Sequence, residues 1–452
     1  MKSKYFILIG RKKAPIFTKI FTFPLMNPKN QSKTLNCWAM YDWANSVYSL
    51  VITSTIFPIY YNSVVGDSNG LVMLFGKQFN NTALYSFSLS FSFLIIMVLS
   101  PILSGMADYG GMKKQFMKFF CYLGSLSCIA LFWFNGENVI YGLSFFMLAG
   151  IGFSGSLVFY NAFLPEIATP DKQDSVSAKG FSLGYFGSVI LLVFCLVMVM
   201  KPEVFGITDP SMPPKISFLL VGFWWMGFAQ ITFFNLKEEK RNSLYHSDIL
   251  LKGFKELKSA IKKALKSESI KTFLSSFFFY SLSVQTVMYV AAIFGSKELN
   301  LESSQLIITI LIIQLIAILG AWFFSKVSMR KGNKWALLCL ISVWIFICIA
   351  AYFTTTANQF FALAAAVGLV MGGIQSLSRS TFSKIIGDTK DTASFFSLFD
   401  VLEKGGIVLG TLLFGLIDQI TGSMRLSILV FIFFFALGLL LLLRLKVKFT
   451  TN

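Results

Sequence analysis

Charge is scarce in this chain of 452 residues, because Asp, Glu, Lys and Arg make up only 13% of it. Soluble domains carry roughly a quarter of their residues as these four types. Hydrophobic residues fill 55% of the chain, and near-continuous apolar runs of about twenty residues recur along it. Since every backbone N–H and C=O group in a bilayer must be satisfied within the protein, such runs become helices. The composition excludes a water-soluble domain and predicts an all-α membrane protein.

The sequence also lacks the motifs of catalysis and of nucleotide-driven transport. It has no ATP-binding loop, no nucleophile elbow and no cluster with metal-ligand spacing. The six cysteines lie in or beside apolar runs and are read as small hydrophobic residues. We therefore expect no enzyme activity, no cofactor and no metal.

The apolar runs predict twelve transmembrane helices. All but five of the 39 Lys and Arg residues fall on the side of the N-terminal tail and the alternate loops, which the positive-inside rule assigns to the cytoplasm. Both termini are thus predicted to be cytoplasmic, in the inner (plasma) membrane. The net charge of +18 is read as an insertion signal that also attracts lipid, and not as a nucleic-acid site. The predicted spans are residues 36–62, 82–106, 117–135, 139–165, 177–200, 215–236, 271–294, 303–325, 334–353, 358–378, 397–418 and 424–444.

A lysine-rich segment divides these spans six and six. Within it, apolar residues from Ile249 to Leu265 recur at helical spacing with lysines on the other faces. This pattern predicts an amphipathic helix on the cytoplasmic membrane surface, with a solvated linker as the alternative. The lone His246 is read as a linker residue. The predicted domains are a tail (1–35), a six-helix bundle (36–236), the linker (237–270), a second bundle (271–444) and a tail (445–452).

Two short basic turns follow the second and the eighth predicted spans. A shift of 221 residues aligns Ser104 with Ser325, Gly111 with Gly332 and Lys113 with Lys334. Equivalent turns in both halves predict two parallel, pseudo-symmetric six-helix bundles, a pattern of rocker-type transporters.

The first of these turns resembles the loop 2-3 signature of the major facilitator superfamily: Asp108, Gly111, Lys113 and Lys114 match it, and Ser104 stands in the place of its leading Gly. The segments from Ala39 to Tyr61, Phe159 to Ala168 and Gly372 to Ser380 resemble one of its families. That family groups many bacterial transporters with the fungal vacuolar amino-acid effluxer of autophagy. The resemblance implies the twelve-helix major facilitator fold and export of a solute, with amino acids as the first candidate.

The first span carries an acidic residue inside the membrane, where a charge is costly. Asp42, Asn45, Ser46, Ser49 and Thr53 follow spacings of three and four, so they form one polar stripe. The stripe is expected to face a cavity or a partner helix. Asp42 is either a site for a substrate amine or a proton, or an acid held by a basic partner near the cytoplasmic rim.

Three further spans add polar side chains to the candidate substrate site. Asn161 in the fourth span, Gln285 in the seventh and Gln375 in the tenth are the candidates. Glu166, at the end of the fourth span, is expected to serve a gate or an interdomain salt bridge. Arg379 presents a fork suited to carboxylates, so it either binds an anionic solute group or clamps Asp42 or Glu166.

The start of the eleventh span carries Asp400, Glu403 and Lys404. In the superfamily, the loop 2-3 aspartate commonly contacts the start of helix 11. The resemblance therefore implies that Asp108 pairs with Lys404, or with another basic residue nearby, and holds the cytoplasmic gate shut in the outward-facing state. An exposed charged rim without pairing is the alternative.

These features together predict a facilitator-type uniporter or proton-coupled exporter that works by alternating access. Its partners are expected to be a small solute, protons where transport is coupled, and lipid, and the protein is expected to be a monomer. A non-transporting receptor or scaffold is the alternative, and it would have a sealed cavity.

Overall fold

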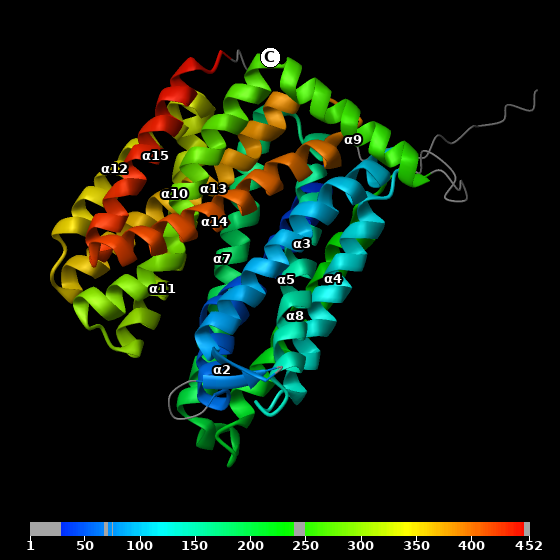
Figure 1. The fold of residues 1–452 in the computed structure, drawn as a ribbon. Coiled ribbons are helices and arrows are strands. Elements are labelled where there is room, and N and C mark those ends of the chain that lie inside the picture. The colour runs from blue at the N-terminus through cyan, green and yellow to red at the C-terminus, as the bar shows by residue number, and fades with distance from the viewer. Residues whose placement is uncertain (1–28, 67–70, 75, 239–248, 447–452) are drawn as a thin grey trace, which may run out of the picture.

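The computed structural model describes residues 29–66, 71–74, 76–238 and 249–446. Long helices dominate these residues and form two bundles (Figure 1). The N half contains α1 (Ser32–Val47), the π-helical η1 (Tyr48–Ile56), α2 (Phe57–Val64), α3 (Asn81–Gly110), α4 (Lys113–Ala130), the 3-10 turn η2 (Leu131–Trp133), α5 (Val139–Ala162), α6 (Leu164–Ile167), α7 (Pro170–Met200), the 3-10 turn η3 (Pro202–Phe205) and α8 (Met212–Asn235). The C half contains α10 (Glu268–Leu299), α11 (Ser303–Lys331), α12 (Asn333–Phe353), α13 (Ala357–Ile386), α14 (Thr392–Thr421) and α15 (Met424–Arg444).

The prediction of twelve spans is confirmed. Ten helices of the described residues are long and apolar enough to cross a bilayer by length and composition alone. The first span is divided into α1, η1 and α2, and α14 carries the four charged residues Asp400, Glu403, Lys404 and Asp418; neither is among these ten helices. Most helices extend a few residues beyond their predicted ends. An antiparallel hairpin of β1 (Leu71–Leu74) and β2 (Lys77–Asn80), which was not predicted, precedes α3.

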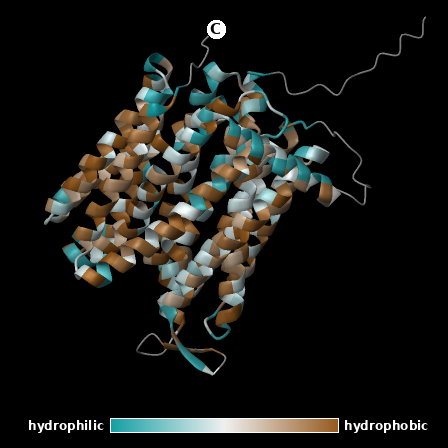
Figure 2. Ribbon diagram, turned by 45° about the horizontal axis from the view of Figure 1, so that its top comes forward, coloured by the Kyte–Doolittle hydropathy of each residue, from teal (hydrophilic) through white to brown (hydrophobic). Residues whose placement is uncertain are grey.

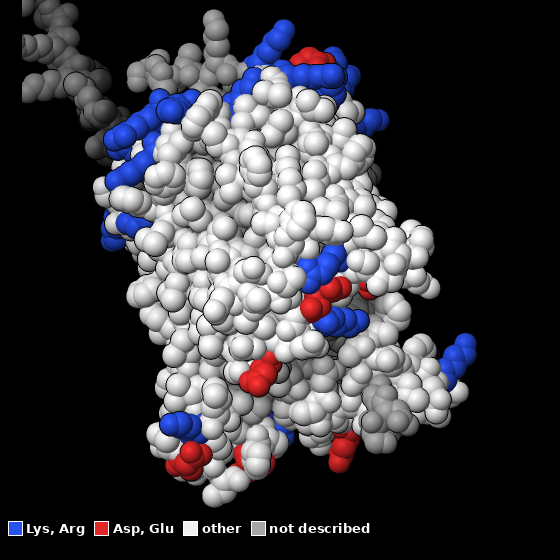
Figure 3. Space-filling model, turned by 90° about the vertical axis from the view of Figure 1, so that its left-hand side faces the viewer, with Lys and Arg blue, Asp and Glu red and all other residues white. Residues whose placement is uncertain are grey.

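Hydropathy and charge follow the long axis of the bundle. The helix bodies are hydrophobic and their ends are hydrophilic (Figure 2). A mostly uncharged band, interrupted by one small group of Lys or Arg and Asp or Glu side chains, separates one end, where Lys and Arg gather, from an opposite end of mixed charge (Figure 3). We call the first the basic end; α15 ends there too (Figure 1). This distribution is the one expected of a multi-pass membrane protein.

The two halves repeat the same turn, as predicted, with a one-residue correction. The glycine after α3 and the glycine after α11 both have positive φ. A lysine that follows each glycine binds a backbone carbonyl near the end of another helix. Lys114 Nζ donates to the carbonyl of Leu236 at the end of α8 (2.7 Å), and Lys334 Nζ donates to the carbonyl of Leu445 after α15 (2.9 Å). The structural counterpart of Lys334 is therefore Lys114 and not Lys113, because the second turn is one residue shorter.

The predicted linker helix is present as α9 (Ile249–Lys266), and it crosses the basic end beside α3 (Figure 1). Contact is close, since a Cβ built on Gly105 of α3 would lie 2.2 Å from the carbonyl oxygen of Gly253. Leu257 is buried, whereas Phe254 and Leu265 of the predicted apolar face are exposed. One part of the apolar surface of α9 therefore packs on the bundle, and the other part is exposed. Its place on the membrane surface stays a prediction, and His246 lies outside the described residues.

Candidate transport cavity

A cavity of about 260 Å³ lies between the two halves. Its wall combines α1, η1, α3, α5 and α7 of the N half with α10, α11, α13 and α14 of the C half. All of the predicted substrate-binding residues line it, together with Ser46, Thr53, Arg379, Glu403 and Lys404. These predicted residues are Asp42, Asn45, Ser49, Asn161, Gln285 and Gln375. The polar stripe of the first span therefore faces the cavity, although η1 changes the helical register partway along it.

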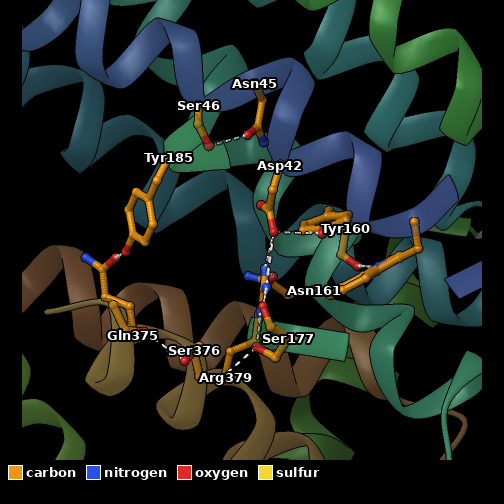
Figure 4. Close-up of polar contacts among 12 residues, drawn as sticks. Asp42, Asn45, Ser46, Tyr160, Asn161, Ser177, Tyr185, Gln375, Ser376 and Arg379 are labelled. Carbon is orange, nitrogen blue, oxygen red and sulfur yellow. Dashed lines mark hydrogen bonds and ion pairs between the residues drawn. The ribbon is translucent and has the colours of Figure 1, made fainter. Parts of the chain in front are cut away.

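Asp42 is bound by groups from both halves (Figure 4). Nη1 and Nη2 of Arg379 each lie 3.1 Å from its Oδ2 atom, and the hydroxyl of Tyr160 donates to the same atom at 2.9 Å. The side chain of Asp42 is almost fully buried. Gly180 of α7 makes room for it, since a Cβ there would lie 2.3 Å from Oδ2. Of the two partners predicted for Arg379, the structure has Asp42 and not Glu166.

The guanidinium of Arg379 is held on every side. Its Nε donates to Ser177 Oγ (2.9 Å), Nη2 donates to the Ser177 carbonyl (2.8 Å) and Nη1 lies 3.3 Å from Asn161 Oδ1. The aromatic rings of Phe181 and Trp38 lie 4.2 and 4.9 Å from its central carbon. A guanidinium so enclosed is a clamp between α13 and the N half.

Tyr185 and Gln314 are among the cavity residues that the sequence analysis did not name. Tyr185 of α7 donates to Gln375 Oε1 of α13 at 2.6 Å, a second bond between the halves beside the clamp (Figure 4). Gln314 of α11 also lines the cavity. The sequence could have identified Gln314, because it is the one amide in the middle of a long apolar run. It could not have identified Tyr185, since aromatic residues are common throughout this chain.

Glu403 and Lys404 lie in the cavity wall and Asp400 lies behind them, so their predicted place at a gating rim is wrong. Lys404 Nζ lies 3.3 Å from Asp400 Oδ1 and 3.2 Å from Glu403 Oε2. Gln285 Nε2 of α10 donates to Glu403 Oε1 at 2.9 Å. The cause of the error is depth: α14 begins at Thr392, five residues before the predicted span, which moves these charges inward.

The predicted pair of Asp108 with Lys404 is also wrong. Asp108 accepts hydrogen bonds from the backbone N–H groups of Ala393 (3.1 Å) and Ser394 (2.7 Å) in the first turn of α14. A helix N-terminus attracts a carboxylate through its unsatisfied N–H groups and its dipole, which explains this contact. The expected contact between the loop 2-3 aspartate and the start of helix 11 is thus present, with a different partner.

Glu166 contacts the C half through a hydrogen bond and not through the predicted interdomain salt bridge, because its ion pair lies within the N half. Its partner is Lys113, and Thr392 Oγ1 of the C half donates to the same carboxylate at 3.1 Å. Lys113 Nζ also lies 3.1 Å from Thr392 Oγ1. The other loop 2-3 residue at this interface is Ser104, whose hydroxyl lies 3.0 Å from that of Ser397.

A second interdomain cluster was not predicted. Asp174 of α7, which is fully buried, accepts from Ser328 Oγ (2.8 Å), Asn333 Nδ2 (2.8 Å) and Lys384 Nζ (2.6 Å) of the C half. Charged residues near the ends of predicted spans are common, so nothing in the sequence singled these out.

The comparisons with known proteins agree with this architecture. A family model described as "Vacuole effluxer Atg22 like" matches residues 30–451. The MFS-type transporter YxiO of Bacillus subtilis (strain 168) is 31% identical over 401 residues, covering 88% of this chain and 92% of YxiO. Autophagy-related protein 22 of Saccharomyces cerevisiae (strain ATCC 204508 / S288c) is 26% identical over 423 residues, covering 81% of this chain and 78% of that protein.

Solved structures show the same fold at low sequence identity. The major facilitator superfamily transporter FucP in the outward conformation matches with a TM-score of 0.68 and 13% identity, covering 93% of this chain and 99% of that chain. A bacterial homologue of the iron transporter ferroportin, in the outward-facing state with soaked iron, matches with a TM-score of 0.64 and 12% identity, covering 93% and 100% of the two chains. The twelve helices therefore have the major facilitator fold.

Proposed function

Because this chain belongs to the Atg22-like vacuole effluxer family of major facilitator transporters, we propose that it exports a small solute by alternating access. The basic end is the cytoplasmic end, and the membrane is the plasma membrane. Amino acids are the first solutes to test, because the sequence resembles the family that includes the fungal vacuolar amino-acid effluxer.

The observation that carries the proposal is the cavity between the halves, with Asp42 and Arg379 bound across it. Alternating access needs a site that both halves build, because rocking one half against the other then changes the side from which the site is reached. A polar cavity inside an apolar bundle is costly unless it binds something.

The contacts between the halves support a state that is closed at the basic end. Asp108, Glu166 and Asp174 each bind the opposite half there. To open this end, the protein must break these contacts and the Asp42–Arg379 clamp below them. The clamp thus couples the solute site to the closed end, because a solute that competes for Asp42 or Arg379 weakens one of the contacts that hold the halves together.

Export can be measured in proteoliposomes loaded with a mixture of metabolites, with efflux read by mass spectrometry with and without a proton gradient. Asp42→Asn and Gln375→Ala are expected to lower the flux of the transported solute at least about tenfold, since each removes a buried polar contact. Gln230→Ala is the matched control, because Gln230 lies on α8 outside the cavity wall. Intact fluxes in both cavity variants would disprove the site, and no flux of any solute in the wild type would favour a receptor.

A further inference from the structure

The charges in and directly behind the cavity wall do not cancel. The carboxylate of Asp42 is matched by the guanidinium of Arg379. On α14, in contrast, the two carboxylates of Asp400 and Glu403 share the single ammonium of Lys404. The facing residues that α3 and α10 supply, Phe93, Gln285 and Tyr289, are uncharged. With all of these groups ionised, the cluster of Asp400, Glu403 and Lys404 carries one surplus negative charge.

The geometry shows how this surplus is distributed. Lys404 Nζ lies between Asp400 Oδ1 (3.3 Å) and Glu403 Oε2 (3.2 Å), and both distances are long for a buried ion pair. Gln285 supplies a hydrogen bond to the other oxygen of Glu403. The Oδ2 atom of Asp400 is buried, and no described residue donates a hydrogen bond to it. The cluster therefore has capacity for another positive group.

A surplus charge inside a membrane protein raises the free energy of the state that holds it. Carboxylates that share a site do not ionise together without an additional cation or proton. Removing one partner of a buried ion pair strongly destabilises a protein, because the remaining charge is uncompensated. A positive ligand that enters the cavity recovers part of this free energy.

Glu403 is the carboxylate that such a ligand can reach. Its side chain is 25% exposed and lines the cavity, whereas that of Asp400 is 8% exposed and lies behind the wall. We propose that Glu403, supported by Asp400 and Lys404, binds one positive charge in the cavity, either a proton or the ammonium group of the solute. The solute part of this inference rests on the proposed function, whereas the proton part needs only the cavity.

This assignment moves the cation site away from Asp42. The guanidinium of Arg379 already neutralises Asp42, and Tyr160 donates to the same oxygen. The two clusters then have separate tasks: Asp42 and Arg379 bind the halves together, and the α14 cluster binds the cation.

Proton binding is tested on the purified full-length protein by infrared difference spectroscopy during acidification. A protonated carboxyl group has a C=O band that a carboxylate lacks. We expect a component of this band in the wild type that is missing in Glu403→Gln, because that variant leaves Asp400 and Lys404 as a balanced pair. Glu298→Gln is the matched control: Glu298 is 23% exposed, like Glu403, but it forms a one-to-one pair with Arg425 away from the cavity.

Ammonium binding is tested by counterflow in proteoliposomes with the twenty standard amino acids and the corresponding desamino acids, read by mass spectrometry. Glu403→Gln is expected to lower amino-acid flux about tenfold or more, since a charged hydrogen bond is lost, and Glu298→Gln is expected to leave it unchanged. Loss of the band alone identifies the proton as the ligand, and loss of flux alone identifies the ammonium group.

The results also separate this inference from the proposed function. If Glu403→Gln changed neither the infrared band nor a flux that the wild type shows, the inference would be overturned and export would stand. If the wild type moved no solute while its band still depended on Glu403, export would fail and the cation site would stand as a proton site.

Discussion

Two seams join the halves at the basic end, and they use different chemistry. At the α3–α14 seam, Asp108 binds the backbone N–H groups that begin α14. At the α7–α13 seam, Asp174 binds the ammonium of Lys384 and the side chains of Ser328 and Asn333. The pseudo-symmetry that relates the helices therefore does not extend to the side chains that hold them.

The linker adds to this difference, because α9 packs on α3 and reaches α14. Gly253 touches Gly105 of α3, and Lys263 pairs with Asp391 at the start of α14. One seam is held by a helix dipole and braced by the linker helix, while the other is held by a buried ion pair. We infer that the α7–α13 seam depends more on individual side chains, and the α3–α14 seam more on backbone and packing.

Among the substitutions considered, one at the α7–α13 seam is expected to cause the largest loss of stability. Lys384→Met leaves the fully buried carboxylate of Asp174 without its lysine, which is expected to cost about 3 to 5 kcal/mol of stability. Thermal unfolding of the purified protein measures the loss. Lys297→Met, at an exposed lysine, is the control. Adding Asp174→Asn to Lys384→Met is expected to restore most of the stability, and a double variant as unstable as the single one would contradict a charge effect.

A smaller loss is expected at the α3–α14 seam. Asp108→Asn keeps an acceptor for the N–H groups of Ala393 and Ser394 but removes the charge that favours the helix N-terminus, which is worth up to about 2 kcal/mol when partly buried. The same unfolding measurement tests it. A reciprocal swap of Asp108→Lys with Lys404→Asp is expected to give no rescue of transport, since these side chains do not pair. Rescue would show that they meet in another state.

The contact between α3 and α9 is expected to contribute less to stability than Asp174 or Asp108. A methyl group in Gly105→Ala would overlap the backbone of Gly253, so α9 has to move away from α3, at a cost of about 1 kcal/mol. Hydrogen exchange of residues 249–266 is expected to accelerate. Gly227→Ala is the control, because a Cβ there meets nothing within 4 Å. Unchanged exchange in Gly105→Ala would show that α9 is held by other contacts.

The features that the sequence predicted correctly are those that follow from the free-energy cost of placing polar groups in lipid. Apolar runs located the spans, the stripe beginning at Asp42 located the cavity, and the need for a countercharge suggested the pair with Arg379. At the basic end the cost of a charged residue is low, so the pair of Asp174 and Lys384 could not be predicted from the sequence. The partner of Asp108 could not be predicted either, because backbone N–H groups leave no mark in a sequence.

The smallest expected effect concerns Glu238, which follows α8 and accepts from the N–H groups of Lys113 (2.6 Å) and Lys114 (2.7 Å) at the start of α4. Burial raises the pKa of Glu238, although the charge of Lys113 and these two hydrogen bonds oppose the shift. A raised pKa in the folded state means that ionisation costs stability as the pH rises through it. We therefore expect Glu238→Gln to raise the unfolding temperature slightly at neutral pH, and this gain to vanish in acid, where the wild type is protonated. A loss of stability at neutral pH would show instead that the carboxylate stabilises the start of α4 as a helix cap, as Asp108 does for α14.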